Sequence, residues 1–143
     1  MTTSPRSILF ACNMNSVRSP MAAALAGRFL GPSVHVESAG VYEGALDPFA
    51  GAVMEEAGLD ISGHVAREFG AVDVAGFDLV VALTPEAARA AEGFTDASRI
   101  ELWTVANPSD TRGSREQVMD AYRGTRRALE RRIAERFGSQ AAG

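Results

Sequence analysis

The sequence predicts an α/β fold with a mainly parallel sheet of four strands, because strand-like and helix-like segments alternate along its 143 residues. The clearest strand is Phe77–Thr84, a β-branched apolar run typical of a sheet covered on both faces. The clearest helix follows Ser114, where apolar side chains recur at spacings of three and four residues. This length suits one domain over residues 1–143, with frayed ends at 1–5 and 139–143.

Each predicted strand is a short apolar run bounded by turn residues. The four strands are expected at Ile8–Ala11, Val34–Glu37, Phe77–Thr84 and Arg99–Trp103. Between the first two strands, Ser19 is expected to cap a helix whose first turn contains Pro20. This helix should end after Leu30, because Gly31-Pro32 follows it.

Three further helices have comparable start signals. Asp47 and Thr84 each precede a proline, and we expect them to cap the second and third helices. The last helix should be the longest and should begin at a capping box formed by Ser114 and Gln117. Gly138 is expected to end it.

Composition argues against several classes of function. One cysteine cannot form an internal disulfide, which favours a reducing cytoplasm. The chain has no lysine, which removes a Walker P-loop and any lysine Schiff base to a cofactor. Two histidines and one cysteine, widely spaced, do not form a zinc motif, so we expect neither metal nor cofactor. The net charge of −4 and the short apolar runs give no reason to expect nucleic-acid or membrane binding.

The single cysteine lies in the most informative motif. Cys12 ends the first predicted strand, Arg18 follows six positions later, and a helix then opens. Converging backbone N–H groups at a helix start bind a phosphate-sized oxyanion, and a guanidinium can grip it with two parallel hydrogen bonds. The same donors would favour the thiolate of Cys12, making it a nucleophile, whereas the alternative is a buried structural cysteine. The anion-binding residues would be Asn13, Met14, Asn15, Ser16, Val17 and Arg18.

The run that ends in Cys12 and continues with Asn15, Arg18, Ser19 and Pro20 resembles the low-molecular-weight protein tyrosine phosphatases. Thioredoxin-coupled arsenate reductases share their fold. The likeness extends from about residue 7 to the last helix. It implies three layers, with a four-stranded parallel sheet flanked by helices and the anion-binding loop between the first strand and the first helix.

The resemblance also assigns residues that support the loop. It implies that Asn15 holds the loop through hydrogen bonds with Ser38 and His64, and that the hydroxyl of Ser19 stabilises the thiolate. Asparagine also tolerates the positive φ that a tight anion loop often needs. Ordinary turn and cap chemistry is the alternative for Ser38 and His64.

Several positions depart from the family pattern or concern the substrate. Met14 stands where the family usually has glycine, so its side chain is expected to reshape substrate entry. Val17 stands where the family often has a second cysteine, so oxidised Cys12 could not be rescued by an internal disulfide. Tyr42 is a candidate aromatic wall for a phosphotyrosine ring, or else a surface tyrosine.

The largest departure concerns the general acid. The family places an Asp-Pro pair shortly before the last helix, whereas this chain has Asn107-Pro108 there. An amide cannot donate a proton as a carboxylic acid does. Asp110, three residues further on, is a candidate substitute acid, or else a solvated loop carboxylate.

Three hypotheses follow for the function. The leading one is a phosphatase that cleaves phosphotyrosine or small aryl phosphomonoesters through a phospho-Cys12 intermediate. Its partners would be a phosphorylated protein or an aryl phosphate, with inorganic phosphate as product and inhibitor, and it would be a monomer or weak dimer. The second is an arsenate reductase that uses an external thiol, because the chain lacks further cysteines. The third is an oxyanion-binding protein with weak turnover.

Overall fold

The computed structural model describes residues 4–142. In this part of the chain, one parallel sheet has the strand order β2-β1-β3-β4. The strands are β1 (Ser7–Cys12), β2 (His35–Gly40), β3 (Leu79–Ala82) and β4 (Ile100–Leu102). The α-helices are α1 (Arg18–Leu30), α2 (Pro48–Glu56), α3 (Pro85–Ala91) and α4 (Arg115–Ala142). Short 3-10 turns are η1 (Phe69–Ala71), η2 (Val74–Gly76), η3 (Ala97–Arg99) and η4 (Pro108–Asp110).

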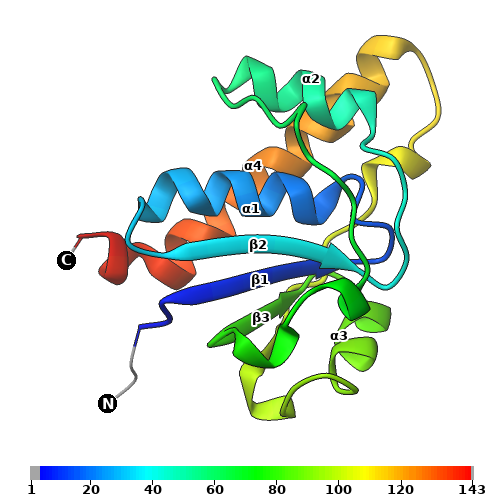
Figure 1. The fold of residues 1–143 in the computed structure, drawn as a ribbon. Helices are drawn as coiled ribbons and strands as arrows, with labels where there is room; N and C mark the ends of the chain where they lie inside the picture. The colour runs from blue at the N-terminus through cyan, green and yellow to red at the C-terminus, as the bar shows by residue number, and fades with distance from the viewer. Residues whose placement is uncertain (1–3, 143) are drawn as a thin grey trace.

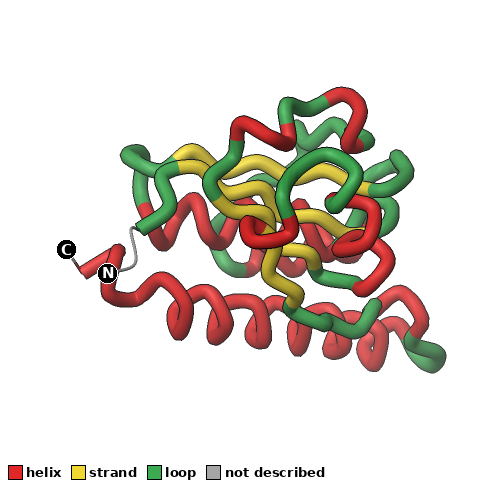
Figure 2. Tube along the Cα trace, turned by 90° about the horizontal axis from the view of Figure 1, so that it is seen from below, coloured by secondary structure: helices red, strands yellow, loops and turns green. Residues whose placement is uncertain are grey.

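The sheet is the middle of three layers, as predicted. Helices α1, α2 and α4 cover one face, and α3 covers the other (Figure 1). Alternate residues of β1 enter the two cores: Ile8, Phe10 and Cys12 face the larger one, whereas Leu9 and Ala11 face the smaller one. Figure 2 shows α4 running along one side of the molecule for most of its length.

Three predicted helix starts are confirmed. Asp47 caps α2, because its Oδ1 accepts a hydrogen bond from the backbone N–H of Phe49 at 2.8 Å. Thr84 caps α3 through a bond from Ala87 N at 3.0 Å. Ser114 and Gln117 form the reciprocal bonds of a capping box before α4.

The predicted start of α1 is wrong by two residues, since Ser19 was expected to cap a helix beginning at Pro20. The helix begins at Arg18, its N-cap is Val17, and no side chain caps it. Ser19 therefore lies inside the first turn, and its hydroxyl faces Cys12 and Asn15 instead of a backbone N–H. The reason is that the thiol of Cys12, at the end of β1, and the amide of Asn15, in the loop between β1 and α1, hydrogen-bond to that hydroxyl.

The predicted end of α4 is also wrong. The helix continues through Gly138 to Ala142, because a single glycine costs a helix only about 1 kcal/mol and no proline follows. At the other end Pro5 is buried, so the expected fraying does not extend to it. Residues 1–3 and 143 of the two tails lie outside the described residues.

Strand β2 is longer than predicted, and its extra residues position the site. It continues past Glu37 to Gly40 because these residues pair with the end of β1, with Cys12 opposite Gly40. The pairing persists beyond both strands, since Val41 N donates to the carbonyl of Cys12 at 3.1 Å. The carboxyl ends of β1 and β2, at the right of Figure 1, therefore lie beside the loop that follows Cys12. Among the described residues, no helix is both long and apolar enough for a membrane span.

Candidate active site

The thiol of Cys12 lies at the buried end of the central strand, with 2% of the residue exposed. Its Sγ is 3.0 Å from Oγ of Ser19. Asn15 Nδ2 donates to the same hydroxyl oxygen at 2.8 Å, so the hydroxyl hydrogen points elsewhere. Its two possible acceptors are the sulfur of Cys12 and the carbonyl of Ala39, the latter at 3.4 Å. A hydroxyl that donates to sulfur stabilises a thiolate.

The loop around the thiol is organised by Asn15. This residue has φ of 54° and is fully buried. Its Nδ2 also donates to Oγ of Ser38 at 3.0 Å, and its Oδ1 accepts from the backbone N–H of Arg67 at 2.9 Å. His64 Nε2 lies 2.8 Å from the carbonyl oxygen of Asn15, so that nitrogen carries the hydrogen. The structure thus brings Asn15, Ser19, Ser38 and His64 into one hydrogen-bond network.

Arg67 is a member of this network that sequence reasoning missed. Its guanidinium donates to Oε1 of Glu37 at 2.6 Å and to the carbonyl of Ser38 at 3.4 Å. Burial acts to raise the pKa of Glu37, but hydrogen bonds from His35 and Arg67 outweigh it and hold that pKa below its ordinary value. The ion pair therefore fixes the segment whose N–H group binds Asn15.

A second anchor of the loop, also missed, is Asp47. Its backbone N–H donates to the carbonyl of Ser16 at 3.0 Å, and its Oδ2 accepts from the hydroxyl of Tyr122 at 2.7 Å. Burial, the hydrogen bond to Asp47 and the Asp47 charge raise the pKa of Tyr122 strongly, so this hydroxyl stays a donor. The cap of α2 thus connects the loop to α4.

Arg18 lies at the other end of the loop and is nearly buried, with 9% of the residue exposed. Its Nη1 donates to the carbonyl oxygen of Val105 at 2.9 Å. This bond holds the guanidinium near Val105, and the donor fork of a guanidinium is of the kind that suits a tetrahedral oxyanion. Cys12 and Arg18 thus occupy the two ends of one compact loop.

The mouth of the loop has a polar rim. Asn13 accepts a hydrogen bond from Oγ1 of Thr84 at 2.7 Å and donates to Oε2 of Glu86 at 3.3 Å. Tyr42 is about half exposed, and the charge of the same carboxylate raises the pKa of Tyr42. Met14 is also exposed at this edge. Glu86 had no role predicted from the sequence, because it is 73 residues from Asn13 along the chain.

Among the described residues, no hydrogen bond connects Cys12 with Asn107, at the family's acid position, or with Asp110, the candidate substitute acid. Asn107 caps η4, and its Oδ1 accepts bonds from the backbone N–H and the hydroxyl of Ser109 at 3.1 and 2.8 Å. Asp110 is exposed at the end of the same turn. Its charge makes a small contribution to the raised pKa of Tyr122.

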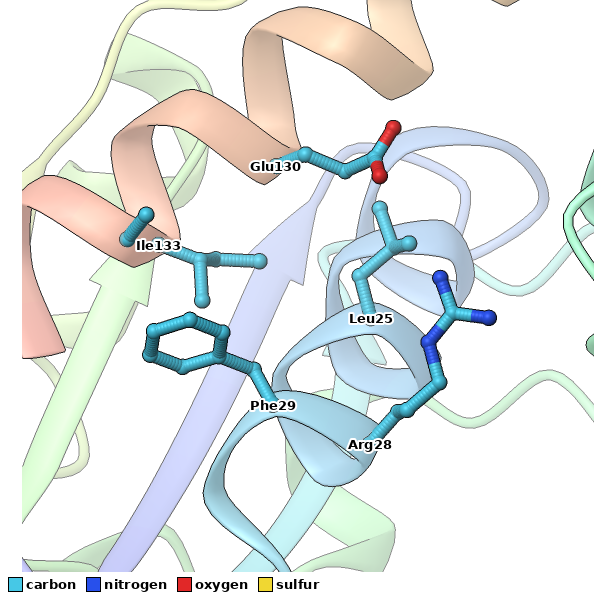
Figure 3. Close-up of a pocket in the computed structure, with 6 residues that line it drawn as sticks. Leu25, Arg28, Phe29, Glu130 and Ile133 are labelled. Carbon is cyan, nitrogen blue, oxygen red and sulfur yellow. The ribbon is translucent and has the colours of Figure 1, made fainter. Parts of the chain in front are cut away.

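A separate pocket of about 390 Å³ lies between α1 and α4 (Figure 3). Phe29 and Ile133 point toward each other across it, with Arg28 and Glu130 at its edge. None of the residues predicted to bind an anion lines it. The candidate active site is therefore the loop after β1.

The fold and the site together define an α/β protein whose loop from Cys12 to Arg18 lies at the carboxyl end of its central strand. The chain belongs to the low molecular weight phosphotyrosine protein phosphatase family, which matches residues 7–139. Members of this family act as phosphatases or as arsenate reductases.

Named relatives represent both activities. The chain is 31% identical to an arsenate reductase of Bacillus subtilis, over 90% of this chain and 92% of that protein. It is 26% identical to a glutaredoxin arsenate reductase of Synechocystis, over 90% of this chain and 93% of the other. The structure is also similar to a low molecular weight protein tyrosine phosphatase from T. tengcongensis, with a TM-score of 0.79, 26% identity and coverage of 93% and 98%.

Proposed function

We propose that this protein is an arsenate reductase that uses Cys12 as nucleophile and an external thiol as reductant. One observation carries the proposal. The nucleophile, the guanidinium and the loop network are complete, whereas the residue at the family's acid position is an amide engaged in capping η4. Such a site suits a substrate whose leaving group needs no positioned acid.

Arsenate is such a substrate. The thiolate of Cys12 attacks arsenic, an As–O bond breaks, and the departing hydroxide takes a proton from solvent to become water. The backbone N–H groups of the loop and Arg18 stabilise the charge on the remaining oxygens. This step leaves a covalent bond between Sγ of Cys12 and As(V).

The external thiol completes the reaction. Its thiolate attacks Sγ of Cys12, the S–As electron pair stays with arsenic, and arsenite leaves as As(III). A second thiol then resolves the mixed disulfide on Cys12. In sum, one arsenate and two thiols give one arsenite, one disulfide and one water. Both electrons come from the external thiol, because the 143 residues contain no second cysteine.

The missing general acid has a larger effect on phosphate ester hydrolysis than on arsenate reduction. A positioned general acid contributes roughly 10²–10⁴ to the rate of such reactions. An alkyl oxygen depends on that proton most, whereas a phenol, with a pKa of about 10, can leave without it. Hydrolysis of aryl phosphates at Cys12 is therefore the second candidate function. The half-exposed ring of Tyr42 and the exposed Met14 at the rim favour it, since both can contact an aryl group.

The deciding experiment supplies arsenate and a thiol to the purified protein and measures arsenite by mass spectrometry. The native chain should form arsenite in proportion to disulfide, and Cys12→Ser should form none. Arsenate bound without arsenite, and no phosphatase activity, would instead establish a binding protein. Hydrolysis of an aryl phosphate without arsenite would establish the second candidate. Inorganic phosphate should inhibit whichever reaction occurs, because it matches arsenate in shape and charge.

A further inference from the structure

Three elements converge at one edge of the loop mouth. Asn13 directly follows the nucleophile, Tyr42 follows β2, and Glu86 lies in the first turn of α3. Tyr42 N donates to the carbonyl of Asn13 at 2.7 Å, and the Asn13 side chain donates to Glu86 at 3.3 Å. The charge of the same carboxylate raises the pKa of the Tyr42 phenol, so the two groups are neighbours. Glu86 is thus held at the rim by Asn13 and lies beside Tyr42.

The charge of this carboxylate is not neutralised by a cationic partner. Among residues 4–142, Glu86 forms no ion pair with an arginine or a histidine, and its described partners are the uncharged Asn13 and Tyr42. The residue is partly exposed, so its charge is accessible to solvent at the rim of the loop. A fixed negative charge beside an anion site opposes the approach of any second anion.

We propose that Glu86, held at the rim by Asn13, is a specificity-determining residue that selects the external thiol by charge. It favours thiols that carry a cationic group or no charge and rejects thiols that carry a carboxylate. This inference rests on the proposed function, because it concerns the second substrate of that reaction. Arsenate itself tolerates the carboxylate because it is held by Arg18 and the loop N–H groups, which an approaching thiol does not contact.

Coulomb's law gives the size of the effect. For unit charges roughly 8 Å apart in an effective dielectric between about 40 and 80, the interaction changes a rate by about two- to fivefold. The Glu86 charge slows the reaction of an anionic thiol and accelerates that of a cationic thiol. Removing the carboxylate should therefore shift their relative rates by about four- to twentyfive-fold, and high salt should reduce that shift.

The test uses three thiols of similar size: 2-aminoethanethiol, 2-mercaptoethanol and 3-mercaptopropionate. For each, the rate of arsenite formation per thiol concentration is measured with the native chain and with Glu86→Gln. The rate with Glu86→Gln is divided by the rate with the native chain. This ratio cancels the intrinsic reactivity of the thiol and any common change in arsenate binding. We expect this ratio to be highest for 3-mercaptopropionate and lowest for 2-aminoethanethiol.

Glu92→Gln is the matched control. It removes the same charge from an exposed carboxylate at the end of the same helix, away from Asn13 and Tyr42. This variant should leave the order of the three thiols as in the native chain. Equal ratios for all three thiols with Glu86→Gln, or the same shift with Glu92→Gln, would overturn the proposal.

A second readout separates this inference from the proposed function. Cys12 is reacted with the symmetrical disulfides of the same three thiols, and the mixed disulfide is followed by mass spectrometry without arsenate. Removal of the Glu86 charge should again accelerate the anionic reagent relative to the cationic one. If no thiol supports arsenite formation but this order is found, the proposed function fails and the charge selection at the rim stands. If the order is absent here too, the rim proposal fails.

Discussion

Replacing Asn15 by alanine tests the network that shapes the loop. The substitution removes the acceptor of Arg67 N and the donor to Ser38 in a fully buried setting. A buried polar group left without its partner costs about 1–3 kcal/mol. Alanine at a φ of 54° adds about 1 kcal/mol of backbone strain. Because two buried groups lose their partner, we expect the free energy of unfolding to fall by about 3–7 kcal/mol in total.

Thermal unfolding followed by circular dichroism measures this change. For a domain of this size, about 2–4 °C correspond to 1 kcal/mol, so the melting temperature should fall by about 10 °C or more. Asn15→Gly removes the same amide but tolerates the positive φ, and should recover about 1 kcal/mol of the loss. Asn107→Ala, which removes a capping amide outside the loop, should cost only about 1 kcal/mol. A fall below about 3 °C for Asn15→Ala would refute the structural role of this network.

Three other predictions follow from the same contacts. Gly40→Ala should lower the free energy of unfolding by about 1–3 kcal/mol and weaken arsenate binding, because the new Cβ would lie 2.6–2.9 Å from backbone atoms that cannot move aside. Gly51→Ala in α2 is the control: its Cβ meets nothing within contact distance, so it should be neutral or stabilising. Asn107→Asp should raise the steady-state rate of alkyl and aryl phosphate hydrolysis by about 10-fold or more and leave the rate of arsenite formation little changed. An unchanged hydrolysis rate would show that the acid position is not functional in this chain. Glu37 has a pKa below its ordinary value of about 4.5, so its ion pair with Arg67 contributes stability at neutral pH that is lost as the pH falls through that lowered pKa. Glu37→Gln should therefore lower the melting temperature at about pH 7 more than at about pH 3, and an equal change at both would contradict this.

The fold could be predicted because its signals are local. Alternating apolar runs and helix caps such as Asp47 and Thr84 each depend on a few neighbouring residues. The loop from Cys12 to Arg18 is also contiguous, so its spacing, together with the apolar run before it and the helix start after it, predicted an anion site. Ser19 shows the limit of this approach, since its local pattern indicates a cap and its actual partners lie across the loop.

The remaining site residues depend on contacts between distant segments. Arg67 reaches Asn15 across 52 positions, and Glu86 reaches Asn13 across 73. Nothing in the local sequence around either residue indicates these contacts, because they arise from the parallel pairing of β1 with β2 and β3. The single signal for Arg67 was its place three residues after His64, which the family resemblance had already assigned to the loop.

The central claim is that Cys12 reduces arsenate with electrons from an external thiol. The most direct measurement is the yield of arsenite from arsenate and 2-mercaptoethanol, compared between the native chain and Cys12→Ser. We expect the native chain to form one arsenite for each disulfide, and the variant to bind arsenate without forming arsenite. Equal arsenite formation by both proteins, or none by a native chain that hydrolyses aryl phosphate, would contradict it.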